Sequence, residues 1–127
     1  MRVYWEDTDA SGVVYHARYL NLFERARTEW LRALGFEQSE LSQTHGIVFA
    51  VRRMEIDYLL PARLDDQLRV SAIPETPRGA RIIVRQEMTR TADGELLSRA
   101  RVEAVSLAAG SFRAVRLPRH VSEKMTA

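Results

Sequence analysis

Two carboxylates and a run of small residues lie shortly before the first predicted helix. Asp7 and Asp9 precede the turn Ala10-Ser11-Gly12, and a helical pattern begins a few residues later. A carboxylate can act as a general base or a nucleophile, and the free amides at a helix N-terminus can hold a developing oxyanion. One short segment can therefore supply both functions. The alternative is that either aspartate only caps a turn or the helix, which is a common role for Asp.

The helix that would follow this segment is predicted over residues 17–34. Its apolar side chains recur every three or four residues and form one stripe: Tyr19, Phe23, Ala26, Trp30 and Leu34. Such a stripe must be buried against another element. Gly35 stands where a helix end favours a left-handed residue.

The rest of the chain is predicted to be mostly extended. Residues 1–6 begin with β-favouring side chains and predict a short first strand, while residues 37–45 predict an additional helical turn. After Gly46 the period changes, and strands are predicted over residues 47–59, 67–73, 80–91 and 95–109. The Asp93-Gly94 pair between the last two strands predicts a hairpin.

These elements indicate an α+β fold. Consecutive strands joined by short turns favour an antiparallel sheet, and the single long helix must pack on it. We therefore expect a single domain over residues 1–127, with a sheet of about five strands wrapped around one central helix. Such a sheet leaves edges uncovered, so we also expect oligomerisation.

The composition excludes several functional classes. The net charge of +2 is too balanced to favour nucleic acid, and the absence of cysteine excludes a thiol nucleophile and cysteine-ligated metals. No apolar run approaches the roughly 20 residues of a membrane-spanning helix, and no apolar stretch precedes the acids near the N-terminus. We expect a cytoplasmic protein with no nucleic-acid partner and no membrane insertion.

Residues 6–32, EDTDASGVVYHARYLNLFERARTEWLR, match a long signature. They resemble the 4-hydroxybenzoyl-CoA thioesterase family of hotdog-fold enzymes. Within that family they are most similar to the YbgC-type acyl-CoA thioesterases associated with the bacterial Tol–Pal gene cluster, which carry a DTDAGGVVYHxxYLxxxERARTEWLR pattern. The match is nearly continuous over residues 3–34. The strand order and the late FRAVRLP segment are also similar, so the resemblance covers almost the whole chain.

The resemblance implies a role for individual residues. The second aspartate of the DxD pattern, Asp9, would be the catalytic carboxylate, and the backbone N–H of His16 would be the oxyanion donor. Asp7 would orient the loop. The stretch Val13-Val14-Tyr15 would line the route of the acyl group. Separately, the phosphates of coenzyme A suit arginine contacts, and we assign these to Arg113 and Arg116 because they follow the last predicted strand.

The resemblance also implies the reaction. The protein would hydrolyse an acyl-CoA thioester without a cofactor or metal, as a homodimer with shared active sites and as a homotetramer. Acyl carrier protein is a second candidate acyl donor. A rival hypothesis is a non-catalytic scaffold that binds acyl carrier protein or acts in the cell envelope. The length and chemistry of the acyl group stay open.

Three other arrangements are weaker. Ser11, His16 and Asp9 lie within one loop, whereas a catalytic triad normally gathers residues from distant segments. Glu24 on the helix is a fallback general base. The three histidines, His16, His45 and His120, lack the paired spacing of a metal site, so no metal is expected.

Overall fold

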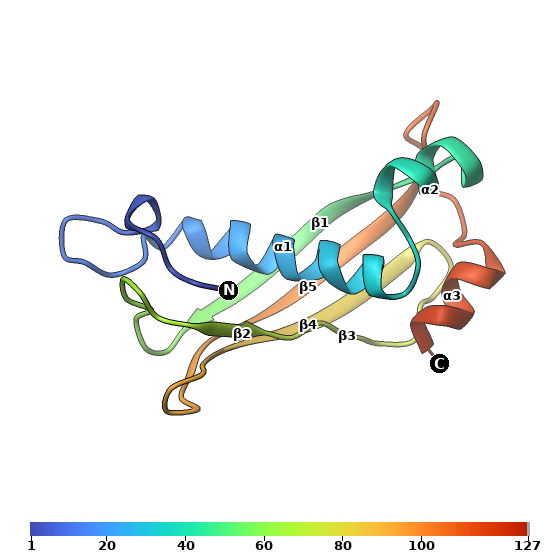
Figure 1. Cartoon of the computed structure of the whole chain (residues 1–127). Helices are drawn as coiled ribbons and strands as arrows, with labels where there is room; N and C mark the ends of the chain where they lie inside the picture. The colour runs from blue at the N-terminus through green and yellow to red at the C-terminus, as the bar shows by residue number, and fades with distance from the viewer. Residues whose placement is uncertain (127) are drawn as a thin grey trace.

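The computed structural model describes residues 1–126 as one sheet, three α-helices and a short 3₁₀ helix (Figure 1). In chain order the elements are η1 (Trp5–Asp7), α1 (Arg18–Ala33), α2 (Gln38–His45), β1 (Ile47–Tyr58), β2 (Leu68–Val70), β3 (Ile73–Pro74), β4 (Arg81–Arg90), β5 (Leu96–Ala108) and α3 (Arg119–Thr126). The predicted α+β class, the central helix and the strands after Gly46 are confirmed.

The sheet is antiparallel and five-stranded, in the order β1-β5-β4-β2, with β3 also paired to β4. The predicted hairpin joins β4 to β5, and Gly94 adopts a positive φ of 72° there. β1 stands at the end of the strand order and pairs only with β5 among the described residues. One long edge of the sheet is therefore free in a single chain.

Helix α1 lies along one face of the sheet (Figure 1). Of the predicted stripe, Tyr19, Phe23 and Ala26 are buried, whereas Trp30 and Leu34 are only half-buried. The helix also buries Leu22 and Leu31, which the predicted stripe did not include.

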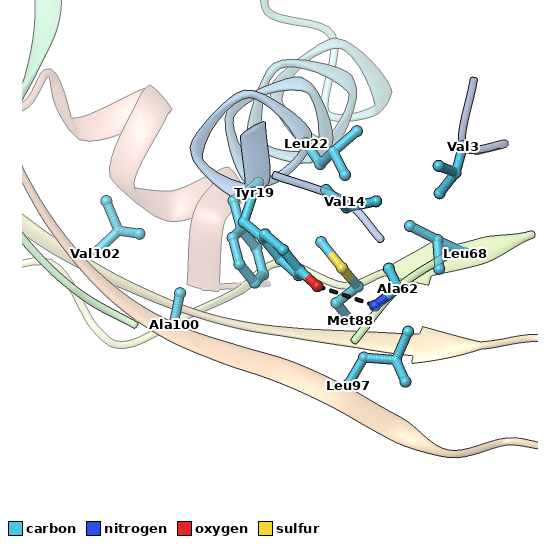
Figure 2. Close-up of a cluster of buried hydrophobic side chains, with 11 residues drawn as sticks. Val3, Val14, Tyr19, Leu22, Ala62, Leu68, Met88, Leu97, Ala100 and Val102 are labelled. Atoms are coloured by element: carbon cyan, nitrogen blue, oxygen red, sulfur yellow. Dashed lines mark hydrogen bonds between the residues drawn. The ribbon is translucent and has the colours of Figure 1, made fainter. Parts of the chain in front are cut away.

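Tyr19 and Phe23 belong to one buried cluster with side chains from β4 and β5, among them Met88 and Val102. Figure 2 shows Tyr19 reaching from the helix toward Ala62 and Met88. The helix ends as predicted at Gly35, whose φ is 94°, and the Phe36 N–H donates to the Leu31 carbonyl at 2.9 Å. This closure is typical of a helix that ends in a left-handed residue.

The prediction of a first strand over residues 1–6 is wrong. The segment forms a single bridge between Arg2 and Gln67 and then turns into η1. The cause is the buried carboxylate of Asp7, which accepts the Tyr4 N–H at 3.0 Å and closes a tight turn. A β-propensity of neighbouring residues is too weak to compete with such a local hydrogen bond.

Two further differences concern the edges of the fold. The predicted strand 67–73 is split into β2 and β3, because the side chain of Gln86 donates to the Ser71 carbonyl at 3.2 Å between them. Helix α3 was not predicted, although Val121 and Met125 are four residues apart and both are buried. No helix within residues 1–126 is long and apolar enough to cross a membrane.

Candidate functional site

The loop before α1 folds back on itself and presents Asp9 at its tip. The Tyr15 N–H donates to the Asp7 carbonyl and the Asp9 N–H to the Val13 carbonyl, both at 2.9 Å. At the tip, the Ser11 N–H donates to Asp9 Oδ1 at 2.8 Å, and Gly12 takes a φ of 80°. Asp9 is solvent-exposed, so its other carboxylate oxygen is free to meet a ligand or water.

Asp7 has a different environment from Asp9. Asp7 is only 2% exposed. Its carboxylate forms an ion pair with Arg18 Nε at 3.3 Å and also accepts a hydrogen bond from the Tyr4 N–H. A buried charge that has both an ion pair and a hydrogen bond is held in place rather than available for reaction. The two aspartates of the DxD pattern therefore differ in exposure: Asp7 is buried beneath the loop, and Asp9 faces the solvent.

The start of α1 has unoccupied amides. Its N-cap is Ala17, which has no side-chain hydrogen bond to the helix, and the first turn contains no acidic residue. Within residues 1–126, the N–H groups of His16 and Ala17 donate no hydrogen bond, whereas the Arg18 N–H donates to Tyr15. These amides carry the positive end of the helix dipole and can bind an anionic oxygen.

Tyr58, at the end of β1, holds the turn that precedes the helix. Its hydroxyl donates to the His16 carbonyl at 2.9 Å, and its ring packs edge-on against Tyr19 with centroids 5.1 Å apart. The Tyr19 hydroxyl in turn accepts the Ala62 N–H at 3.0 Å (Figure 2). Burial raises the pKa of Tyr19. Tyr58 was not among the predicted site residues, because its partner lies 42 residues away and no local pattern signals such a contact.

The predicted acyl-route residues are not equivalent. Val13 is half-buried and forms a bridge with Arg63, whereas Tyr15 is 49% exposed beside the loop. Val14 is 4% exposed and belongs to the core cluster under α1, so its side chain does not face an open route. This is the alternation expected of an extended segment with one face on the core.

Arg113 and Arg116 lie far from Asp9 within one chain. Their segment is tied to the start of β1 by the Ala109 N–H, which donates to the Gly46 carbonyl at 2.8 Å. In Figure 1 this orange segment and the blue loop of Asp9 lie at opposite ends of α1. The structure of a single chain therefore does not bring these arginines together with Asp9.

The weaker candidates do not form a second site in the described part of the chain. Ser11 and His16 share no hydrogen bond within residues 1–126. Glu24 lies on α1, about 12 Å further along the helix than His16. His45 and His120 come together, with ring centroids 4.5 Å apart. No third His, Cys, Asp or Glu in the described part of the chain joins them to form a metal-binding group.

Comparisons with known proteins agree with this architecture. A protein from Haemophilus influenzae named acyl-CoA thioesterase YbgC is 45% identical over 95% of this chain and 88% of its own length. One from Escherichia coli O6:H1, named acyl-CoA thioester hydrolase YbgC, is 40% identical over 95% of this chain and 89% of its own length.

Solved structures show the same fold. A probable thioesterase from Bartonella henselae is 40% identical, with a TM-score of 0.86 over 93% of this chain and 95% of that one. A 1,4-dihydroxy-2-naphthoyl-CoA thioesterase from Synechocystis is 24% identical, with a TM-score of 0.91 over 99% of this chain and 92% of that one, and shows the likeness of fold. The model of the thioesterase-like superfamily matches residues 3–125. The chain therefore belongs to the thioesterase-like superfamily and has the hotdog fold.

Proposed function

We propose that this protein hydrolyses acyl-CoA thioesters, with Asp9 and the backbone N–H of His16 as its catalytic groups. The observation that carries the proposal is the loop of residues 7–16. Its exposed tip presents the Asp9 carboxylate, and its end joins the unoccupied amides at the start of α1. The names and the 40–45% identity of the YbgC relatives support the same reaction.

The chemistry follows from these two groups. In one route Asp9 accepts a proton from water, and the resulting hydroxide adds to the thioester carbonyl carbon. In the other, an Asp9 oxygen adds to that carbon and the anhydride is later hydrolysed. In both routes the carbonyl oxygen becomes an oxyanion, which the His16 N–H and the helix dipole stabilise. The carbon–sulfur bond then breaks and the thiolate leaves, so the reaction needs no cofactor. The side chains of half-buried Val13 and exposed Tyr15 would contact the acyl group.

The free edge of β1 supports a homodimer. A strand of 12 residues with an unpaired edge favours pairing with a second copy, and a twofold axis makes that pairing antiparallel. The start of one β1 then lies beside the end of the other. The partner's segment with Arg113 and Arg116 would thereby approach the loop that carries Asp9.

The proposal has three further parts. The protein assembles as a homotetramer, it accepts acyl carrier protein as a second acyl donor, and it acts in the cytoplasm.

The test is release of free thiol from a panel of acyl-CoAs by the wild type and Asp9→Asn. The panel runs from propionyl to palmitoyl and includes benzoyl-CoA. Asparagine keeps the oxygen that accepts the Ser11 N–H, so the loop should persist while the base is lost. We expect turnover by the wild type and a loss of more than about a hundredfold in Asp9→Asn. Light scattering of the wild type should show at least twice the mass of one chain.

Two outcomes would contradict the proposal. If the wild type hydrolyses no member of the panel, the scaffold hypothesis is favoured, and binding of acyl carrier protein becomes the next measurement. If Asp9→Asn is as active as the wild type, the reaction stands but the site is wrong. Glu24→Gln is then the next variant.

A further inference from the structure

A turn between β1 and β2 supports the loop that carries the proposed catalytic groups. This support turn, residues 61–66, belongs to no helix or strand of the described chain. Its backbone pairs with that loop: the Val14 N–H donates to the Ala62 carbonyl at 2.8 Å, and Val13 forms an antiparallel bridge with Arg63. The loop therefore has a neighbouring segment from a distant part of the sequence.

The paired residues of the loop lie between the two catalytic groups. Asp9 precedes Val13 and Val14 in the sequence, and His16 follows them. The Asp9 N–H donates to the Val13 carbonyl at 2.9 Å, so the support turn adds a third segment to a small antiparallel arrangement. A displacement of Val13 and Val14 thus changes the separation between the Asp9 carboxylate and the His16 N–H. A misplacement of about 1 Å between reacting groups can lower a rate about a hundredfold.

Arg90, the last residue of β4, holds the support turn from its other side. Its Nε forms an ion pair with Asp66 Oδ2 at 3.1 Å, and its Nη2 donates to the Pro61 carbonyl at 3.1 Å. The same Asp66 oxygen accepts the Arg63 N–H at 2.9 Å within the turn. Both side chains of the ion pair are only 19% exposed. One planar guanidinium therefore binds the two ends of the support turn at once.

The backbone of the support turn depends on such contacts. Asp65 has a φ of 67°, in the left-handed region that residues other than glycine seldom adopt. Its N–H donates to the Val3 carbonyl at 3.0 Å, and the Val3 N–H donates to the Asp66 carbonyl at 2.9 Å. A conformation of this kind costs free energy and persists only where the surroundings fix it. We therefore expect the turn to relax when the ion pair with Arg90 is lost.

We propose that Arg90 and Asp66 are positioning residues for the proposed thioesterase reaction. They act through the support turn, which fixes the separation between Asp9 and the His16 N–H. The inference rests on the proposed function and concerns the same site. Loss of the ion pair should lower kcat and leave KM nearly unchanged, because the substrate-binding surfaces remain while the catalytic groups are no longer held at the right separation.

The experiment compares variants at the two ends of the Arg90 side chain. Arg90→Met removes the guanidinium and keeps the hydrocarbon stem. Asp66→Ala removes the carboxylate that binds it and is the second variant in case the first does not fold. Asp93→Asn is the matched control, because Arg90 Nη1 also donates to Asp93 Oδ2, at 2.8 Å, in the β4–β5 hairpin rather than in the support turn. Asparagine keeps an oxygen that accepts the Glu95 N–H, so the hairpin should persist.

Steady-state kinetics with an acyl-CoA that the wild type hydrolyses give the first readout. We expect Arg90→Met to lower kcat at least about tenfold and to change KM less than about threefold, with Asp93→Asn within about twofold of the wild type. Arg90→Lys should restore part of the loss, because an ammonium can still bind Asp66 but lacks the fork that also reaches the Pro61 carbonyl. Arg90→Met combined with Asp66→Ala should be about as active as the weaker single variant, since both substitutions break one contact.

Hydrogen exchange followed by mass spectrometry gives a second readout, which needs no substrate. The Val14 N–H is bound to the Ala62 carbonyl, and it should exchange at least about tenfold faster in Arg90→Met. The amides in the middle of β5 should exchange as in the wild type. A general loss of stability would speed exchange in both places, so the comparison separates positioning of the loop from stability of the whole domain.

Three results would overturn the inference. They are an unchanged kcat in both Arg90→Met and Asp66→Ala, an equal fall of kcat in Asp93→Asn, and a rise in KM without a fall in kcat. Absence of turnover with every acyl-CoA in the wild type would instead contradict the proposed function. Hydrogen exchange would then decide the inference by itself: faster exchange confined to the loop supports it, and unchanged exchange at Val14 overturns it.

Discussion

The hydroxyl of Tyr58 donates a hydrogen bond to the backbone carbonyl of His16 at 2.9 Å. This contact joins the last residue of β1 to the turn that begins α1. The carbonyl belongs to the same peptide unit as the Ala17 N–H, one of the two unoccupied amides. A hydrogen bond accepted by the carbonyl fixes that peptide plane and polarises its N–H, which becomes a stronger donor.

Tyr58→Phe should therefore lower kcat more than it changes KM. Loss of the hydrogen bond to the His16 carbonyl loosens the peptide that joins His16 to Ala17, beside the proposed oxyanion donor. If its energy of about 1 kcal/mol is lost from transition-state stabilisation, kcat falls about fivefold. Steady-state kinetics with one acyl-CoA measure it, and thermal unfolding checks that the fold is kept. Tyr4→Phe removes the hydroxyl of another exposed tyrosine and serves as the control. An unchanged kcat in Tyr58→Phe would show that this contact does not orient the site.

Substitution of Asp7 should lower stability, whereas substitution of Asp9 should lower activity. Asp7→Ala leaves the Tyr4 N–H and Arg18 without their buried partner, and we expect the free energy of unfolding to fall by about 2–3 kcal/mol. Asp9→Asn changes an exposed side chain and should cost less than about 0.5 kcal/mol while it abolishes turnover. Urea unfolding of both variants measures the difference. A larger loss of stability in Asp9→Asn than in Asp7→Ala would mean that their roles are reversed.

Arg113→Ala and Arg116→Ala test the contact with coenzyme A. If Arg113 and Arg116 of the second copy bind the phosphates of coenzyme A, each variant should raise KM for an acyl-CoA about threefold to tenfold. The value of kcat should stay nearly unchanged. The same acyl group on pantetheine lacks the nucleotide, and its KM should not change. Arg69→Ala, an exposed arginine on β2, is the control. Equal effects on the CoA and pantetheine esters would exclude phosphate recognition.

Alkaline pH should destabilise the protein through Tyr19. Burial raises its pKa above the usual value of about 10, so the unfolded chain loses this proton first as pH rises. The contribution of Tyr19 is complete below about pH 10 and is lost as pH approaches the folded pKa, by at most about 1.4 kcal/mol per pH unit. The free energy of unfolding, measured from pH 8 to 11, should fall less steeply in Tyr19→Phe. If the free energy of unfolding depends on pH in the same way in the wild type and in Tyr19→Phe, burial does not raise the pKa of Tyr19.

Local patterns were sufficient for most of the fold. The stripe from Tyr19 to Leu34, the end at Gly35 and the Asp93-Gly94 hairpin depend on neighbours within a few residues, and their periodicity alone predicts them. The same local character makes the loop from Asp7 to His16 recognisable, because its turn and the following helix start are continuous in sequence. The resemblance to a known family then assigned roles within that loop.

Contacts between distant segments decided the rest. The sequence alone determined that Asp7 and Asp9 stand before a helix, but only the tertiary structure buried Asp7 against Arg18 and left Asp9 exposed. Tyr58 reaches His16 only because β1 ends beside the start of α1. Burial and packing depend on which elements the fold brings together, and no local periodicity encodes that.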